Sequence, residues 1–391
     1  MLSPVWIPLL ILIISFDFWL GYKRREWIKE QGSVLLEIKI PREMMKSPAA
    51  MELFISTLHN SAVGNLLDVY LKGRVRPWFS LELVSIDGTV HFFIWSLKNA
   101  KSSIETQLYA QFPNIEVHEV PDYSLGIHHD PEKYTFGWFG HMILTKADAY
   151  PIKTYIDYGL DKDPKEEYKN DPMTTVLEYL GSLKKGEQVW IQIMIQANAK
   201  EGLKYGRILT KPDWKGGVDK EIKDLIKKAR FKPEGDQQPS SLHLSKDQQD
   251  TIAAIERNIA KNAFDTMIRA VYFAEKDAFN PTNIGGLIGS FKQFSSNTLN
   301  GFKPGFSAGY EYPWQDFRGG KKKKEQKQLL EAYKRRSFFN TPFKNFHIKP
   351  FVLTTEELAT IFHFPSSEVA ATPTLSRIPS KKAEAPANLP V

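Results

Sequence analysis

The chain has 391 residues, of which 42% are hydrophobic and 25% are charged, as in an ordinary globular protein of two or three domains. It contains no cysteine, which excludes disulfides, Cys-ligated zinc, iron–sulfur clusters and thiol nucleophiles. The formal net charge of +7 favours contact with anionic lipid or nucleic acid and does not choose between them.

The first feature along the chain is an apolar run at residues 5–22, the only stretch long and apolar enough to cross a bilayer. As a helix it would span roughly 27 Å, close to a hydrocarbon core of about 30 Å. Basic residues follow the run and none precedes it, which predicts a single pass through the inner (cytoplasmic) membrane, with the N-terminus outside and the remaining domains in the cytoplasm. The residues expected to anchor it at the two bilayer surfaces are Trp6, Trp19, Tyr22, Lys23, Arg24 and Arg25.

Two other interpretations of this run compete with the anchor. A cleaved signal peptide needs a basic region before the apolar run and a small-residue cleavage site after it, and both are missing from the sequence. A buried core helix would explain Asp17, because a carboxylate inside a membrane span is costly. Asp17 lies six residues, less than two turns, before Lys23, so its carboxylate could reach interfacial water or Lys23 or Arg24, and we favour the membrane anchor.

Residues 32–124 are predicted to form a first α+β domain. Alternating apolar residues predict strands at 33–40, 78–86, 90–98 and 115–120, with Asp87-Gly88 as a hairpin turn. Ser47-Pro48 marks the start of one helix and residues 101–112 form another. The order β-α-β-β-α-β is typical of a ferredoxin-like (split βαβ) unit.

Residues 125–365 repeat this order loosely and predict a second ferredoxin-like domain. Strands are expected at 136–146, 187–197 and 264–275, with 349–353 as the final strand. Asp171-Pro172 and Asn280-Pro281 begin the two helices. Residues 198–263 form a long insertion that ends in a helix at 245–262, opened by a capping box of Ser245 and Gln248.

Residues 295–349 do not fit the repeat, because they are dense in aromatic and basic side chains. Rings that stack and cations that neutralise phosphate are the chemistry of single-stranded nucleic-acid binding, while a solvated loop beside a core is the plainer alternative. The candidate contacts to nucleic acid or a partner are Lys321, Lys322, Lys323, Lys324, Lys334, Arg335, Arg336 and Trp314. The last segment, 366–391, is rich in Pro, Ala and Lys and is predicted to be a disordered tail.

The sequence lacks the common catalytic signatures. It has no phosphate-binding loop of the GxxxxGK[ST] type, no HExxH and no GxSxG. The adjacent His128 and His129 have no third ligand at a suitable spacing, so they do not predict a metal site. We therefore expect a protein that is not an enzyme and that uses no cofactor or metal.

One segment near the end carries a resemblance to a known group of proteins. Residues 351–365 read FVLTTEELATIFHFP and residues 372–377 read TPTLSR. The segment resembles the junction that precedes the motor domain in bacterial membrane-anchored conjugation ATPases, the type IV secretion coupling-protein and HerA-like group. The matching positions are Thr355, Glu356, Glu357, Leu358, His363 and Pro365. On residue pattern alone, residues 354–362 form a packing helix, and both roles can coexist.

This resemblance implies the membrane and adaptor region of such a machine without its motor, because the chain ends at Val391 where the ATPase would follow. The expected partners are the cytoplasmic membrane and a separately encoded motor ATPase, with DNA and a second copy of the chain as further candidates. The alternative function is a membrane-tethered binder of single-stranded nucleic acid. An enzyme whose site is assembled from scattered loop residues is a third possibility, since fold alone does not exclude activity.

Overall fold

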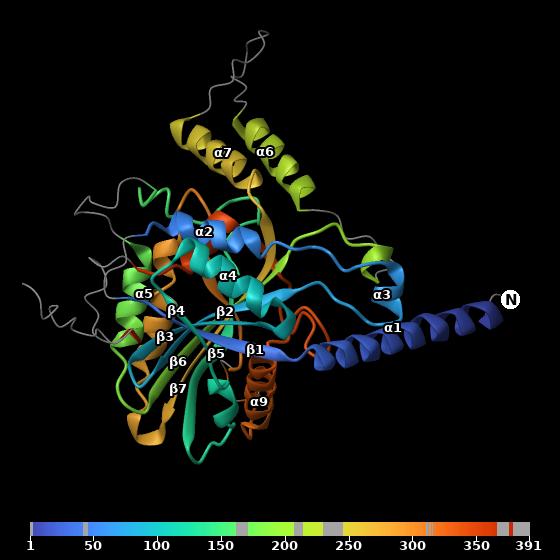
Figure 1. Cartoon of the computed structure of the whole chain (residues 1–391), viewed down its shortest axis with the longest axis horizontal. Coiled ribbons are helices and arrows are strands. Elements are labelled where there is room, and N and C mark those ends of the chain that lie inside the picture. The colour runs from blue at the N-terminus through green and yellow to red at the C-terminus, as the bar shows by residue number, and fades with distance from the viewer. Residues whose placement is uncertain are drawn as a thin grey trace, which may run out of the picture.

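A computed structural model describes residues 3–41, 46–161, 171–206, 214–229, 245–309, 312, 314, 316–365 and 375–377. In this part of the chain, nine strands form one antiparallel sheet with helices packed on both faces, and the N-terminal helix α1 (Ser3–Gln31) extends away from the body (Figure 1). The protein is thus a mixed α/β molecule built on a large antiparallel sheet.

The sheet has the strand order β4-β1-β3-β2-β6-β7-β5-β8, and β9 pairs with β7 beside this path. The strands are β1 (Ser33–Lys39), β2 (Trp78–Ile86), β3 (Thr89–Leu97), β4 (Glu116–Glu119), β5 (Tyr134–Leu144), β6 (Glu187–Ala197), β7 (Ala263–Glu275), β8 (Phe302–Ser307) and β9 (Phe351–Thr354). Strand β2 pairs with β6 over its whole length, from Trp78 opposite Gln196 to Ile86 opposite Gln188. The two halves of the chain therefore share one continuous sheet.

One face of the sheet, the helical face, is covered by five helices: α2 (Pro48–Thr57), α4 (Lys101–Gln111), α5 (Pro172–Gly181), α8 (Thr282–Gly289) and α10 (Thr355–Ile361). Their apolar stripes pack on the aliphatic side chains that alternate along the strands, such as Leu36, Leu81 and Ile193. The predicted caps at Ser47 and Asp171 are confirmed, since each side chain accepts a hydrogen bond from the first turn of its helix.

The opposite face, the aromatic face, is covered by α9 (Gly320–Lys334) and the chain that follows it. Its core is rich in large rings that come from the sheet, from α9 and from residues 335–348. The largest buried members are Trp78, Phe93, Trp95, Trp190, Phe273, Tyr333 and Phe338. Of the aromatic residues of 295–349, Phe302, Tyr333 and Phe338 are buried, and Phe306, Phe339 and Phe346 are partly buried against the aromatic face.

The insertion between β6 and β7 contains α6 (Lys215–Ala229) and α7 (Lys246–Ile259), which pack together at one edge of the body (Figure 1). The predicted capping box is confirmed: Ser245 accepts from the backbone of Gln248, whose side chain accepts from the Ser245 backbone. A small apolar cluster of Ala149, Val218 and Ile255 joins the pair to the body.

The strands and helices expected in residues 32–124 are confirmed to within about one residue, and the strand expected at residues 349–353 is present as β9, but β8 was not expected. Strand β8 takes the outer position beside β5, and β9 pairs with the beginning of β7. The sequence does not predict β8 because Pro304 and Gly305 interrupt the strand pattern. Both residues are tolerated because β8 is an edge strand.

The tail prediction also needs a correction at residues 375–377. Leu375 is buried and forms a parallel bridge with Val90, and Arg377 forms one with Ile40. These three residues lie on the body and are not a disordered tail, while the rest of the predicted tail, 366–374 and 378–391, lies outside the described residues.

Candidate functional site

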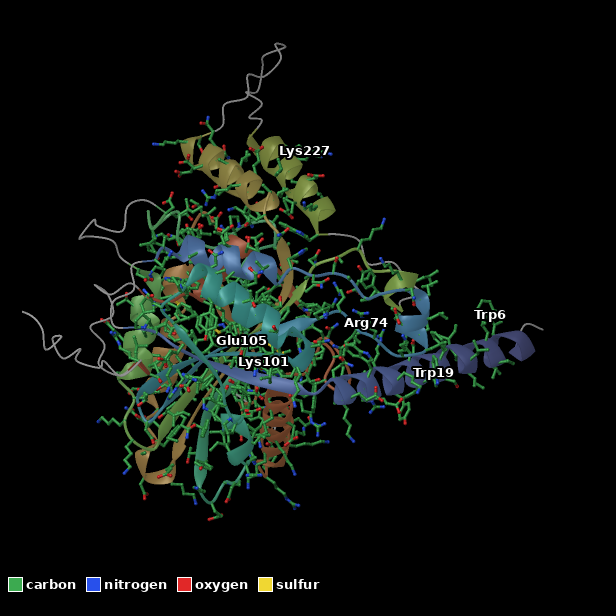
Figure 2. All side chains as sticks on the ribbon, viewed as in Figure 1. Trp6, Trp19, Arg74, Lys101, Glu105 and Lys227 are labelled. Carbon is green, nitrogen blue, oxygen red and sulfur yellow. The ribbon has the colours of Figure 1, made fainter. Side chains whose placement is uncertain are left out.

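Helix α1 has two ends of different character. The segment Trp6–Gln31 is long and apolar enough to cross a membrane, and only 6% of its most apolar window is buried in the protein. Trp6 is 63% exposed and Leu10 is 59% exposed. Figure 2 shows Trp6 and Trp19 on the part of the helix that stands clear of the body. An isolated apolar helix surface of this size is unfavourable in water, so it requires a membrane or a partner to cover it.

The other end of α1 is docked on the body. Leu20 is buried, the rings of Phe16 and Tyr70 lie 5.7 Å apart, and Arg24 Nη2 donates to the carbonyl of Tyr205 at 2.8 Å. Trp27 and Ile28 pack against the aromatic face. Gly32, with a φ of 64°, then turns the chain directly into β1. Helix and sheet are therefore one packed unit rather than a body on a flexible tether.

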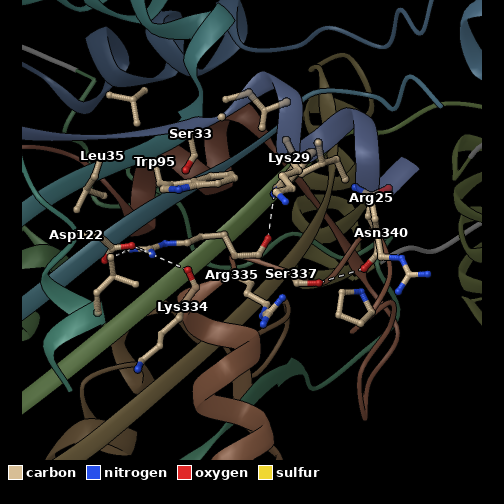
Figure 3. A pocket seen from close by; sticks show the side chains of 18 of the residues that line it. Arg25, Lys29, Ser33, Leu35, Trp95, Asp122, Lys334, Arg335, Ser337 and Asn340 are labelled. Carbon is tan, nitrogen blue, oxygen red and sulfur yellow. Dashed lines mark hydrogen bonds and ion pairs between the residues drawn. The ribbon is translucent and has the colours of Figure 1, made fainter. Parts of the chain in front are cut away.

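A cavity of about 660 Å³ lies where α1, the sheet and the end of α9 meet (Figure 3). Its inner wall is apolar and includes Leu35, Trp95 and Leu97. The lining also contains charged residues: basic side chains from α1, from the end of α9 and from the two residues after it, of which Arg336 is buried, and two carboxylates, Glu119 and Asp122. The basic lining residues are Arg25, Lys29, Lys334, Arg335 and Arg336. An apolar wall under a mostly cationic rim suits an amphipathic, anionic ligand or peptide segment.

The cavity brings together basic residues that the sequence analysis assigned to two separate roles. Arg25 was expected at the membrane surface, and Lys334 and Arg335 were expected to contact nucleic acid or a partner. All three line the same cavity although they lie at opposite ends of the chain. The side chain of Arg335 is 61% exposed and has an ion pair with Glu331 at 3.6 Å.

The prediction for Arg336 is wrong, because this residue is fully buried. Its Nε and Nη2 donate to the two carboxylate oxygens of Glu82 at 2.9 and 3.0 Å, and its Nη1 donates to Asp122. Burial by itself would lower the pKa of Arg336, but Glu82 and Asp122 outweigh it and hold that pKa well above its ordinary value. Arg336 cannot contact an external ligand, and its role is to fix the floor of the cavity.

Glu82 is the centre of this buried network. It also accepts hydrogen bonds from Gln192 Nε2 at 2.8 Å and from the Tyr123 hydroxyl at 2.7 Å. Gln192 in turn accepts from Arg269 Nε at 2.6 Å, and burial lowers the pKa of Arg269 to about 9, which keeps it charged at neutral pH. The guanidinium groups of Arg269 and Arg336 are thus balanced by the carboxylates of Glu82 and Asp122.

The four lysines Lys321, Lys322, Lys323 and Lys324 lie at the other end of α9, about 15–20 Å from Lys334 along the helix. Asp316 caps this end by accepting from the backbone of Lys321 and Lys322, and these backbone hydrogen bonds lower the pKa of Asp316. Beside them, Trp314 is 65% exposed and stacks on Tyr312 with a centroid distance of 4.6 Å, and Phe317 is 88% exposed. We call Tyr312, Trp314, Phe317 and the four lysines the aromatic–lysine patch.

The junction motif is buried in the helical face. Thr355, Glu356, Glu357, Leu358, His363 and Pro365 are all buried. Glu357 closes a capping box with Thr354, and burial raises the pKa of Glu357 to about 7. Glu356 lies 3.1 Å from Arg257, and His363 lies 3.1 Å from Asp171. In this structure the motif residues hold α10 and the following turn in place.

The other residues that the sequence analysis names differ in their surroundings. Lys23 pairs with Glu26 at 2.7 Å, whereas Tyr22 is 55% exposed and Trp19 is 39% exposed. His129 shares a hydrogen bond with Gln326 at 3.1 Å. Among the residues that the structure describes, no group of three or more His, Asp or Glu side chains is arranged to hold a metal ion.

Residues 20–377 match a family described as a domain of unknown function (DUF8128). The chain belongs to this family. The match begins at Leu20, the first residue of α1 that is buried against the body, and it ends at Arg377, which is bridged to Ile40. The family region therefore coincides with the packed body, including the cavity. No curated protein matches the chain.

Proposed function

We propose that the chain is a non-enzymatic adaptor anchored in the cytoplasmic membrane by α1. The observation that carries this proposal is the division of α1 into an exposed apolar end and an end docked on the body. An exposed apolar helix that was merely a linker would not need to be fixed by Leu20, Arg24 and Trp27. A fixed helix places the cavity at a defined height beside the bilayer, which is what an adaptor that presents a binding surface requires.

The topology in the proposal follows from the positions of charge. Lys23, Arg24 and Arg25 follow the apolar end directly, and basic residues are retained on the cytoplasmic side. The body is therefore assigned to the cytoplasm and the N-terminus to the outside. The partner we propose is a motor ATPase of the conjugation or secretion type, on the strength of the resemblance in residues 351–365, and its docking site is the cavity.

A finer description of the fold belongs to the same proposal: we infer that each half of the sheet is a ferredoxin-like unit. In the first half the elements β1-α2-β2-β3-α4-β4 lie in the order β4-β1-β3-β2. In the second half β5-α5-β6-β7-α8-β8 lie in the order β8-β5-β7-β6, which is the same arrangement. Two such units joined through β2 and β6 support the inference.

The topology is tested in cells with single-cysteine variants. Because the chain has no cysteine of its own, any labelling of the protein comes from the introduced residue. Ser3→Cys should react with a membrane-impermeant maleimide in intact cells, and Leu53→Cys, 59% exposed on α2, should react only after lysis. Labelling of Leu53→Cys in intact cells would overturn the cytoplasmic assignment.

The partner is tested by crosslinking. A photo-crosslinker attached at Arg335→Cys should capture an ATPase from detergent extracts, while the same reagent at Leu53→Cys, on the other face, should not. Equal capture from both positions, or capture without any ATPase, would count against the adaptor function.

A second function is favoured by the aromatic–lysine patch: binding of single-stranded nucleic acid. Exposed rings that stack and four neighbouring ammonium groups are the required chemistry. Trp314→Ala with Phe317→Ala should weaken binding of a fluorescent single-stranded DNA in an anisotropy titration. Replacing the four lysines by alanine should flatten the dependence of log Kd on log salt by up to about 3, and unchanged titrations would remove this alternative.

A further inference from the structure

A second apolar surface lies beside the docked end of α1. It consists of α3 (Leu66–Tyr70), the chain up to Arg74, and residues 200–206 with the short turn η3 (Leu203–Tyr205). We call these residues the collar. Four leucines of the collar point to solvent: Leu66, Leu67, Leu71 and Leu203 are 54%, 63%, 58% and 64% exposed. Clustered exposed leucines on a folded domain mark an interaction surface.

The collar is fixed to α1 and does not hang loosely. The ring of Tyr70 contacts that of Phe16 at a tilt of 38°, and its hydroxyl donates to the carbonyl of Leu203 at 2.7 Å, which ties the two collar segments together. Gly73, at a φ of 75°, lies so close to the backbone of Lys23 that a Cβ would clash with it. Gly206 is similarly close to Arg24 and to Leu20, where a side chain would not fit. The height of the collar along α1 is therefore set by the fold.

That height lies within the apolar run of α1. Phe16, the ring that Tyr70 contacts, precedes Tyr22 by six residues, or about 9 Å of helix. If Tyr22 and the following basic residues lie at the headgroups, α3 reaches several ångströms below them. Interfacial helices bury their apolar side about 5–10 Å into the boundary between headgroups and acyl chains. The collar lies at this depth.

The charges of the collar fit an anionic surface. Lys72, Arg74, Lys200 and Lys204 are exposed, and Figure 2 shows Arg74 near the base of α1. Of the collar's acidic residues, Asp68 pairs with Lys72 at 2.8 Å, and Glu201 is buried against Arg76. Leucines flanked by cations are the composition of a lipid-facing surface, whereas an interface core between protein chains is depleted of lysine.

We propose that the collar inserts its leucines into the cytoplasmic leaflet and contacts anionic lipid headgroups through its lysines and Arg74. The proposal rests on the membrane anchoring of α1 and adds a second contact, which fixes the orientation of the body on the bilayer. The cavity rim at Arg25 and Lys29 then lies close to the headgroups.

The test uses the full-length chain in vesicles, with an environment-sensitive fluorophore on single cysteines and lipids that carry a quencher on their acyl chains. The three positions are Leu67→Cys in the collar, Leu10→Cys in the exposed end of α1, and Leu53→Cys as a matched exposed leucine on α2. Quenching is compared in vesicles of phosphatidylcholine alone and with a third of phosphatidylglycerol.

Leu10→Cys and Leu67→Cys should both be quenched several-fold more strongly than Leu53→Cys, and phosphatidylglycerol should increase quenching only at Leu67→Cys. Strong quenching at Leu10→Cys with none at Leu67→Cys overturns the collar contact and leaves the anchor standing. A blue-shifted but unquenched Leu67→Cys label means that protein covers the collar, which also overturns it. No quenching at Leu10→Cys overturns the anchor itself, and the collar proposal falls with it.

Discussion

The two faces of the sheet are covered in different ways. On the helical face, five helices cover aliphatic side chains, and acidic groups of the helices and their caps are buried there: Glu52 on α2, Asp171 at the start of α5, and Glu356 and Glu357 on α10. On the aromatic face, a single long helix covers the centre, and the ion pairs among Glu82, Arg336 and Asp122 are buried under it. The cavity lies on the aromatic face, where α9 ends and α1 begins.

This difference indicates that packing on the helical face mainly stabilises the fold, whereas the ion pairs on the aromatic face mainly fix the position of the cavity residues. Buried ion pairs seldom stabilise a fold more than apolar residues of the same size, because removing both charges from water is costly. The directional hydrogen bonds of a buried ion pair, however, hold the two side chains and their elements in one relative position. The bidentate contact of Arg336 with Glu82 fixes the end of α9 relative to β2, and thereby the floor and the basic rim of the cavity.

The largest expected effect breaks this arrangement. Arg336→Met should lower the free energy of unfolding by about 3–5 kcal/mol, because it leaves the carboxylate of Glu82 buried without its cation. Urea unfolding in mild detergent, followed by tryptophan fluorescence, measures the change. The matched control is the neighbouring Arg335→Met, whose side chain is exposed; it should change stability by less than about 0.5 kcal/mol. Similar losses in both variants would show that the run of basic residues, and not the buried pair, matters.

The next largest effect is a pH dependence of stability that arises on the helical face. Burial raises the pKa of Glu357 from 4.5 to about 7, so the folded state favours the protonated carboxyl. The resulting stability is complete below the unfolded pKa near 4.5 and is lost as pH rises through about 7, a change on the order of 3 kcal/mol. Burial would lower the pKa of His363, but Asp171 outweighs it and raises that pKa above 6.5, so His363 adds a loss of stability in the same direction as the pH rises above 6.5.

Glu357→Gln should therefore flatten the fall in melting temperature between pH 5 and pH 8 without abolishing it, since His363 still titrates. Thermal unfolding in a series of buffers measures this slope. A slope equal to that of the parent protein would assign the pH dependence to other groups.

The same contrast explains what the sequence reveals. Strands β2, β6 and β7 and the helices of the helical face are predictable because local patterns specify them: alternation, turn dipeptides and caps such as Ser47-Pro48 and Asp171-Pro172. Strand β8 is missed because an edge position permits Pro304 and Gly305, which interrupt the local pattern. The path of residues 375–377 is missed because it depends on contacts with strands far away in the sequence.

The cavity could not be predicted, because it is made by segments that are separated by about three hundred residues and brought together by the sheet. A signal was nevertheless present: Glu82 is the one charged residue of the strand WFSLELVSI, and Arg269 lies in the middle of the largely apolar strand FDTMIRAVYFAE. Such residues must be paired when buried. Arg336 shows the converse limit, since a run of three basic residues does not reveal which of them turns inward.

A smaller effect compares two helix caps that are chemically alike. Ser47 accepts from Ala49 at the start of α2 and also donates to the carbonyl of Leu160 at 2.6 Å, at the edge of the main core. Ser47→Ala should lower the free energy of global unfolding by about 1 kcal/mol.

Ser245→Ala removes the cap of the peripheral helix α7 and should increase amide hydrogen exchange in residues 246–259 while leaving the global unfolding transition unchanged. Exchange that changes across the whole sheet would show that the insertion is part of the same cooperative unit.

The smallest expected effect on stability concerns the cavity rim. This test asks whether the rim charges bind a partner without contributing to the stability of the fold. Lys29 and Arg335 line the cavity from α1 and α9, and both are exposed. Because neither is part of the Glu82 network, Lys29→Glu with Arg335→Glu should change the free energy of unfolding by less than about 0.5 kcal/mol per site. The same variant reverses the sign of charge on the rim, so capture of the partner by a crosslinker placed at Lys334→Cys should fall several-fold at low salt. If capture is unchanged while the protein remains folded, the partner binds elsewhere, and the buried network on the aromatic face must be explained by folding alone.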